Sequence, residues 1–220
     1  MPPANRILAV VGMRAEAALL PPGMRVVVSG GDPRRLVALL DAAPDDIAAL
    51  LSFGIAGGLD PALGCGDLVA CTRVRGSGGA YAADPAWTHA IAQRCGARLG
   101  MIAGAAAVVG EPARKRALRT ATGALVVDLE TEAAAAFAAR RGLPFTALRA
   151  VADTAEDLLP RAAAQGLTAD GRPAAGRVAL ALLRHPKELP ALLTIAKRSR
   201  FALQALALAS RRLAGELSPA

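Results

Sequence analysis

Short runs of aliphatic residues recur along the chain and predict the strands of a sheet. The runs lie at residues 7–11, 25–28, 47–53, 67–71, 99–103, 124–127 and 145–151. They are continuously apolar instead of alternating with polar residues, which is typical of strands buried on both faces. Glycine, proline or aspartate borders the runs, as is common where strands end. We therefore expect a sheet that is covered by other elements on both faces.

Segments with helical patterns lie between these runs. We expect helices at residues 33–40, 85–94, 112–119 and 131–140. Three of them begin with proline, which suits the first helical turn because that turn has no use for the missing amide hydrogen. Alternating strands and helices indicate an α/β protein with a central mixed β-sheet flanked by helices. Because 220 residues suffice for one core of this kind, we expect it to form a single domain.

The last part of the chain departs from this alternation. Residues 156–177 are interrupted by proline and glycine and predict a mobile loop near the end of the last strand. Two helical stretches follow, at residues 174–183 and 187–213, and His185-Pro186 separates them. We expect a main domain over residues 1–184 and a basic amphipathic helical extension over residues 185–220 that packs on it.

The final helix predicts two different faces. The apolar residues of one face suit packing on the domain: Leu192, Ile195, Leu203, Leu206 and Leu213. The basic residues lie around the other side: Lys197, Arg198, Arg200, Arg211 and Arg212. Phe201 and Leu208 fall among these basic residues, an arrangement that suits peripheral contact with a membrane. A solvated basic face or a contact between subunits explains the same pattern equally well.

Composition narrows the class of protein further. The net charge of +8 permits contact with an anionic membrane without requiring it. One tryptophan, one tyrosine and four phenylalanines are too few for a platform that stacks nucleic-acid bases, so we expect no nucleic-acid partner. Three cysteines without metal-ligand spacing indicate neither disulfides nor a metal site and favour a cytoplasmic location. No apolar stretch reaches the length of a spanning helix.

Four motifs that could carry chemistry lie where predicted strands end. They are Gly12-Met13-Arg14-Ala15-Glu16, Gly54-Ile55-Ala56-Gly57-Gly58, Asp128-Leu129-Glu130 and Arg149-Ala150-Val151-Ala152-Asp153. Glycine lets a backbone approach a ligand closely, and carboxylates at this edge of an α/β sheet commonly meet the ligand. Taken singly, the glycine motif is better explained by a tight turn, and each acid by its interaction with a helix dipole.

In combination, the four motifs resemble those of the methylthioadenosine/adenosylhomocysteine nucleosidases and their phosphorylase relatives, in order and in approximate spacing. The resemblance covers about residues 7–156. It implies a nucleoside phosphorylase-like fold, a purine nucleoside as substrate and cleavage of the bond between purine and ribose. It also implies a homo-oligomer that needs no cofactor, with water or inorganic phosphate as the second substrate.

The resemblance assigns roles residue by residue. Asp153 resembles the aspartate that protonates N7 of the departing purine, and Glu16 the acid that deprotonates the attacking water. Glu130 resembles the glutamate that binds the ribose hydroxyls. The other substrate-binding residues implied are Ile55, Ala56, Gly57, Val108, Asp128 and Leu129.

Three positions depart from the nucleosidase pattern. Leu129 replaces a methionine beneath the ribose, a swap of similar volume. Ala152 stands where a serine often precedes the catalytic aspartate, so we expect one hydrogen bond that orients Asp153 to be absent. The phenylalanine that flanks the purine would fall near Ala107, where the chain carries only small residues. We therefore expect a wider pocket.

Two substrates fit these features. The alanine-rich pocket, the basic C-terminal helix and residues 149–154 are similar to the hopanoid-associated phosphorylase family, which implies release of adenine from the lipid-linked nucleoside adenosylhopane. The alternative is ordinary methylthioadenosine/adenosylhomocysteine hydrolysis, and a binding module without catalysis is a third hypothesis.

The sequence leaves the attacking group open. Glu16 favours water because a carboxylate repels phosphate, whereas the family name favours phosphate. If phosphate is the attacking group, its candidate ligands are Arg34, Arg35 and Arg73; otherwise these residues are surface charges.

Overall fold

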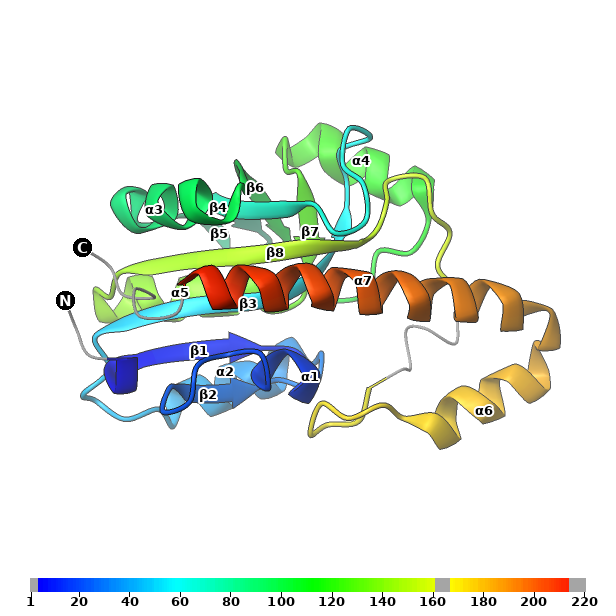
Figure 1. The fold of residues 1–220 in the computed structure, drawn as a ribbon, viewed down its shortest axis with the longest axis horizontal. Helices are drawn as coiled ribbons and strands as arrows, with labels where there is room; N and C mark the ends of the chain where they lie inside the picture. Colours follow the sequence, from blue (N-terminus) through cyan, green and yellow to red (C-terminus); the bar gives the residue numbers. More distant parts are fainter. Residues whose placement is uncertain (1–3, 161–166, 214–220) are drawn as a thin grey trace.

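Eight strands form one mixed sheet in the computed structural model, which describes residues 4–160 and 167–213 (Figure 1). The strands are β1 (Ile7–Val11), β2 (Arg25–Val28), β3 (Ala49–Gly58), β4 (Leu68–Gly76), β5 (Gly79–Ala82), β6 (Arg98–Gly104), β7 (Val126–Asp128) and β8 (Phe145–Asp153). Strand β3 is parallel to β1 and β8, whereas β7 runs antiparallel to β3, and β4 antiparallel to β5 and β8. The predicted mixed sheet is confirmed.

Five of these strands close into a ring. Strand β3 pairs with β8, β8 with β4, β4 with β6, β6 with β7, and β7 again with β3. The register places Gly57 of β3 opposite Val127 of β7 on one side and opposite Asp153 of β8 on the other. Closure therefore brings three of the four sequence motifs to the same end of the sheet.

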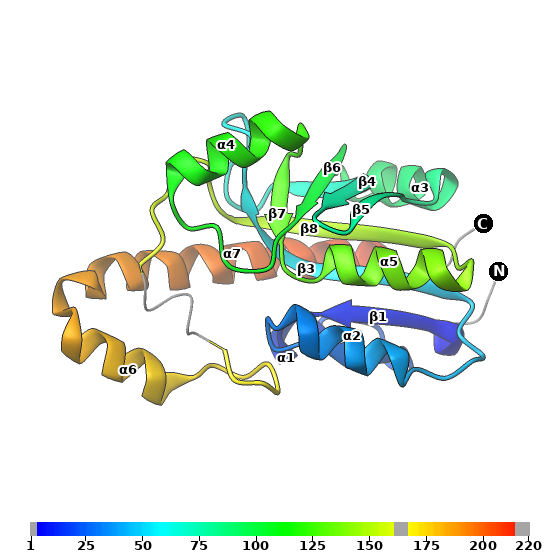
Figure 2. The same cartoon turned by 180° about the vertical axis from the view of Figure 1, so that it is seen from behind.

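Helices cover both faces of the sheet. They are α1 (Arg14–Ala17), α2 (Pro33–Asp41), α3 (Pro85–Cys95), α4 (Pro112–Thr122), α5 (Thr131–Arg141), α6 (Ala175–Arg184) and α7 (Leu189–Leu213), with two short 3-10 helices at Ala4–Arg6 and Pro186–Glu188. Proline begins α2, α3 and α4, as predicted. Helices α2 and α5 share one apolar core, and α3 and α7 share a second core. Figure 1 shows α7 in front of the sheet, and Figure 2 shows α2 and α5 on the opposite side.

Helix α7 has two unlike halves. Ala202, Leu206 and Leu213 of its C-terminal half are buried in the second core. Its N-terminal half continues past the end of the sheet, and α6 turns back below it (Figure 1). Phe201 and Leu208 are 56% and 50% exposed, on the side away from the core, as the helical pattern predicts.

The structure corrects several details of the sequence prediction. Residues 54–58 do not form a tight turn, because they pair with β7 and β8 and extend strand β3 to Gly58. The hairpin strand β5 and the short helix α1 were not predicted. The predicted loop at residues 156–177 includes residues 161–166, which lie outside the described residues, and helix α6 begins within its end, at Ala175.

Candidate active site

A pocket of about 220 Å³ opens where the ends of β3, β7 and β8 meet. Gly12, Met13 and Glu16, which follow strand β1, also line the pocket, as do Ile195 and Ser199 of helix α7. All nine predicted site residues line it: Glu16, Ile55, Ala56, Gly57, Val108, Asp128, Leu129, Glu130 and Asp153. Residues that are far apart in the sequence therefore share one cavity.

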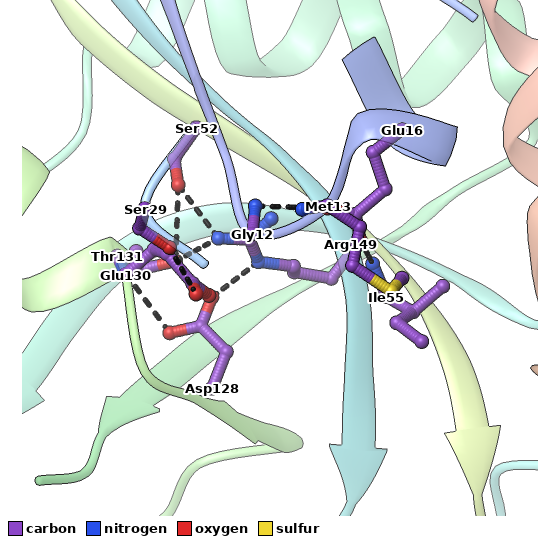
Figure 3. A network of polar contacts seen from close by, with 10 residues as sticks. All are labelled: Gly12, Met13, Glu16, Ser29, Ser52, Ile55, Asp128, Glu130, Thr131 and Arg149. Carbon is purple, nitrogen blue, oxygen red and sulfur yellow. Dashed lines mark hydrogen bonds and ion pairs between the residues drawn. The ribbon is translucent and has the colours of Figure 1, made fainter. Parts of the chain in front are cut away.

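Glu16 is held by the backbone around it. Its Oε2 accepts hydrogen bonds of 2.9 Å from the amides of Gly12 and Met13, and its Oε1 accepts one of 2.8 Å from the amide of Ile55 (Figure 3). Burial raises the pKa of Glu16, against the lowering effects of Arg149 and of these amides. The short helix α1 thus serves to fix one carboxylate at the pocket wall.

Arg149 is the buried centre of a polar network (Figure 3). Its Nε pairs with Asp128, and its Nη2 donates to Ser52 Oγ at 2.6 Å and to Thr131 Oγ1 at 2.9 Å. Asp128 also accepts hydrogen bonds from the amide and the hydroxyl of Thr131. Both oxygens of Asp128 thereby accept hydrogen bonds within the protein, although Asp128 itself lines the pocket.

Gly54 of strand β3 leaves the space that the side chains of this network need. A Cβ on Gly54 would lie 2.5 Å from Glu16 Oε1 and 2.8 Å from Arg149 Nη1, which leaves no space for any side chain. Glu16 Oε1 and Arg149 Nη1 therefore lie on the same side of Gly54. Among the described residues, Nη1 of Arg149 has no hydrogen-bond partner although it is buried.

Glu130 completes a group of three carboxylates around one guanidinium. Its Oε1 accepts a 2.9 Å hydrogen bond from Ser29 Oγ. Burial and the negative charges of Asp128 and Glu16 raise its pKa to about 7, while Arg149 opposes the shift. This wall of the pocket therefore holds three acidic groups against one guanidinium.

Asp153 lies on another wall and has a partner that the sequence did not reveal. Lys115 of helix α4 is fully buried, and its Nζ forms an ion pair with Asp153 Oδ2. It also donates to the carbonyl oxygens of Thr154 at 2.6 Å and of Asp157 at 3.2 Å. Burial raises the pKa of Asp153, and Lys115 lowers it. Ala152 has no hydroxyl that could orient Asp153. Lys115 of helix α4 instead gives Asp153 a charged hydrogen bond.

The remaining walls are apolar and short. Ala107, Val108, Val109, Leu159 and Ile195 line them, and no aromatic side chain of the described residues does so. Small residues line the wall near Ala107, where the nucleosidase pattern has a phenylalanine.

The predicted phosphate ligands lie elsewhere. Arg34, Arg35 and Arg73 do not line the pocket. Nη1 of Arg35 donates instead to the carbonyl oxygens of Val28 and Ser29, at 2.7 and 3.1 Å. A guanidinium engaged with the backbone in this way is not free to hold phosphate, so the structure does not support these three residues as ligands.

The fold defines an α/β protein with a buried acidic pocket at the ends of its strands. The sequence pattern of the phosphorylase superfamily matches residues 31–184, which is most of the chain, and the protein therefore belongs to that superfamily. This membership confirms the predicted fold and the predicted class of enzyme, one that cleaves N-glycosyl bonds. No curated protein sequence matches the chain significantly.

Solved structures of low sequence identity share the fold. A futalosine hydrolase of Helicobacter pylori is 15% identical, with a TM-score of 0.70, over 96% of this chain and 97% of that one. An S-adenosylhomocysteine nucleosidase from Streptococcus pyogenes is 18% identical, with a TM-score of 0.63, over 92% and 95% of the two chains. A methylthioadenosine/S-adenosylhomocysteine nucleosidase from Colwellia psychrerythraea, solved with adenine, is 16% identical, with a TM-score of 0.67, over 94% and 95%.

Proposed function

We propose that this protein hydrolyses the N-glycosidic bond of a purine nucleoside and releases the free base. The observation that carries this proposal is the pairing of two unlike walls in one pocket. One wall gathers Glu16 and Glu130 around Arg149, and another presents Asp153 backed by Lys115. Cleavage needs both, because positive charge develops on the sugar while negative charge develops on the base.

The sugar belongs against the acidic wall. As the C1′–N9 bond breaks, the ribose approaches an oxocarbenium ion, and fixed negative charge in a buried site stabilises it. We assign to Glu130 the acceptance of hydrogen bonds from the ribose hydroxyls, in addition to the one from Ser29. Its pKa of about 7 makes this role depend on pH, since the protonated acid offers less charge.

Water suits this wall better than phosphate does. Glu16 is held by three amides with its Oε1 beside Arg149 Nη1, so a water molecule could donate to the carboxylate and accept from the guanidinium. A phosphate anion would instead meet two further carboxylates. Glu16 takes one proton from the water while the water oxygen bonds to C1′, which completes the hydrolysis.

Asp153 serves the departing base. Adenine is a poor leaving group as an anion, and a general acid that protonates N7 is typically worth about 10² to 10⁴ in rate. Burial raises the pKa of Asp153, which favours the protonated acid that this role requires.

The substrate we propose carries a large apolar group on the ribose 5′ carbon. Val108, Leu159 and Ile195 give the pocket an apolar lining, and Leu158, next to Leu159 in the chain, is exposed. Together with the sequence resemblance, this apolar lining favours adenosylhopane as the nucleoside that loses adenine. The alternative substrates are methylthioadenosine and adenosylhomocysteine, which the names of two structural neighbours suggest.

Helix α7 suits peripheral contact with an anionic membrane, where such a substrate would reside. Leu193, Phe201 and Leu208 are at least half exposed, and Lys197, Arg200 and Arg211 are exposed on the same outward side. Apolar residues set among basic ones bind a lipid surface through both effects. In the part of the chain that the structure describes, no helix is long and apolar enough to cross a membrane.

One experiment tests the reaction and the substrate together. The purified protein is incubated with adenosylhopane, 5′-decylthioadenosine or 5′-methylthioadenosine, with and without phosphate, and the products are analysed by mass spectrometry. We expect free adenine and an unphosphorylated sugar in both buffers, with faster turnover of the two apolar substrates. A ribose 1-phosphate product would identify the reaction as phosphorolysis instead of hydrolysis. A preference for methylthioadenosine would favour the alternative substrate.

A further inference from the structure

Lys115 is buried although its neighbours in helix α4 are not. The side chains of Arg114 and Arg116 are 72% and 62% exposed, whereas that of Lys115 is not exposed at all. Removing an ammonium group from water costs several kcal/mol unless it is paired and hydrogen-bonded. A buried ion pair is rarely more stabilising than apolar residues of the same volume. A lysine in this position is therefore better explained by a role in the pocket than by stability.

The oxygens around Nζ fix the charge of Lys115. Nζ donates to Asp153 Oδ2 and to the carbonyl oxygens of Thr154 and Asp157. An ammonium group has three N–H donors, one for each of these acceptors. A neutral amine has two donors and a lone pair, which would face an oxygen. Lys115 consequently remains charged and does not itself supply a proton to the substrate.

The same contacts determine which oxygen of Asp153 can carry a proton. Oδ2 faces an N–H group of Lys115, so a proton on Oδ2 would point at another donor. Oδ1 receives no hydrogen bond from residues 4–160 or 167–213. Because Asp153 lines the pocket, a proton on Oδ1 is the one available to a bound base.

We propose that Lys115 is a positioning residue for release of the base. Its ammonium group holds Oδ2, so that Asp153 presents its proton on Oδ1, and it stabilises the carboxylate that remains after transfer. This inference rests on the proposed function. In the step, the O–H bond at Oδ1 breaks, an N7–H bond forms, and the electron pair of the C1′–N9 bond moves into the purine. Lys115 keeps all three protons throughout.

Other ionisable groups near Asp153 do not compete with Lys115. Asp157 forms an ion pair with Arg198, which belongs to helix α7. The opposite effects of these two charges on the pKa of Asp153 therefore largely cancel. Burial raises the pKa of the Cys65 thiol, which keeps it uncharged near neutral pH. Removal of Lys115 therefore removes the dominant charge that lowers the pKa of Asp153.

The pH profile of adenine release distinguishes positioning from a structural role. We use Lys115→Met and the milder Lys115→Gln, with the faster of 5′-methylthioadenosine and 5′-decylthioadenosine as the probe. The rate should fall at high pH as Asp153 loses its proton. Without the ammonium group, this alkaline limb should move up by about 1 to 3 pH units, and the maximal rate should fall on the order of 10². A lower rate with an unmoved limb would make Lys115 structural and overturn the proposal.

A double-variant cycle gives a second, independent measurement. If Lys115 acts only through Asp153, Lys115→Met should change the residual rate of Asp153→Asn by less than about twofold. A further large loss in the double variant would contradict the proposal. Should Lys115→Met alone fail to fold, Lys115→Gln and the double variant, which lacks both buried charges, carry the comparison.

The proposed function and this inference fail in different ways. A wild-type protein that neither releases nor binds adenine overturns both. An active wild type, an inactive Asp153→Asn and an unmoved alkaline limb in both Lys115 variants overturn only the role of Lys115.

Discussion

The acidic wall and the Asp153 wall of the pocket solve opposite electrostatic problems. On the acidic wall, Asp128, Glu130 and Glu16 surround the single charge of Arg149, so negative charge is in excess. On the other wall, Asp153 faces one lysine, and the charges balance once Asp153 has given up its proton. The first arrangement stabilises a cation that is fixed in place, whereas the second stabilises the product of one proton transfer. Each wall therefore matches one half of the same bond cleavage.

The two walls also differ in what holds them. Three backbone amides hold Glu16 on the acidic wall, while a side chain from helix α4 holds Asp153. Rigid backbone donors suit a charge that must not move. A single lysine suits an acid whose charge changes during the reaction. Substitutions on the two walls should accordingly produce different kinetic signatures.

Asp153→Asn should produce the largest effect. The amide keeps the shape of the acid but cannot donate its proton, so adenine release should fall by about 10² to 10⁴. Hydrolysis of p-nitrophenyl riboside, whose leaving group departs without protonation, should fall far less. Thermal unfolding checks the fold, and Asp60→Asn, which removes an acid paired with Arg119 outside the pocket, is the matched control. Equal losses on both substrates would remove Asp153 from proton transfer.

Glu16→Gln should slow both reactions, by on the order of 10² at neutral pH. Water must be activated whatever the leaving group is, so the two substrates should lose rate in parallel. Burial raises the pKa of Glu16, and the wild-type rate should decline as the pH falls and Glu16 takes up a proton. The variant should lose the part of this dependence that Glu16 contributes and keep the part that comes from Glu130. A loss confined to adenine release would place Glu16 on the side of the base and break the distinction between the walls.

The sequence predicted the acidic wall better than it predicted the Asp153 wall. Glu16, Glu130 and Asp153 lie beside strand ends, where apolar runs mark their positions and the resemblance assigns their roles. Lys115 stands in the run Arg114-Lys115-Arg116, which is typical of a solvated helix surface. The one available signal was its spacing of three residues from Leu118, which places both on the same helical face.

The fold was predictable from sequence where strands are long and apolar. It was less predictable where pairing between distant strands determines the conformation. The burial pattern of β8 is continuous, and the sequence located it almost completely. Residues 54–58 looked like a turn because glycine favours turns, yet two neighbouring strands hold them extended. Ring closure depends on contacts between β3 and β7 that no local pattern reveals.

Glu130→Gln tests whether the acidic wall sacrifices stability for function. Turnover and binding of ribose-bearing ligands should weaken together by about 10 to 100-fold, because one charge serves both. The folded pKa of about 7 exceeds the ordinary value of 4.5, so folded Glu130 binds its proton more tightly than the unfolded chain does. Stability should therefore fall as the pH rises from about 4.5 to 7.

In this window Glu130→Gln should become more stable than the wild type with rising pH, by on the order of 1 to 3 kcal/mol. Chemical unfolding at pH 5 and pH 8 measures the difference. Unchanged kinetics on every accepted nucleoside would leave Glu130 as an ordinary acid at the start of α5. Kinetic loss without the pH-dependent gain would assign it to binding alone.

The smallest effect we predict lies outside the two walls, on helix α7. Phe201→Ala with Leu208→Ala removes exposed apolar surface, so co-sedimentation with anionic liposomes should weaken on the order of tenfold. Each basic residue near such a surface contributes about 1 kcal/mol, and binding should therefore also weaken as salt rises. Turnover of adenosylhopane in liposomes should fall, while that of 5′-methylthioadenosine should not, because neither residue lines the pocket.

Leu183→Ala on α6 is the matched control, since Leu183 is 80% exposed but lies on the neighbouring helix, outside the basic face of α7. If the double variant sediments as the parent does but changes its mass in solution, this face of α7 is a contact between copies of the chain. The predicted homo-oligomer would then use it. In that case only the apolar pocket wall would support an apolar group on the ribose 5′ carbon. The contrast between the acidic wall and the Asp153 wall would stand unchanged, because neither wall depends on what covers helix α7.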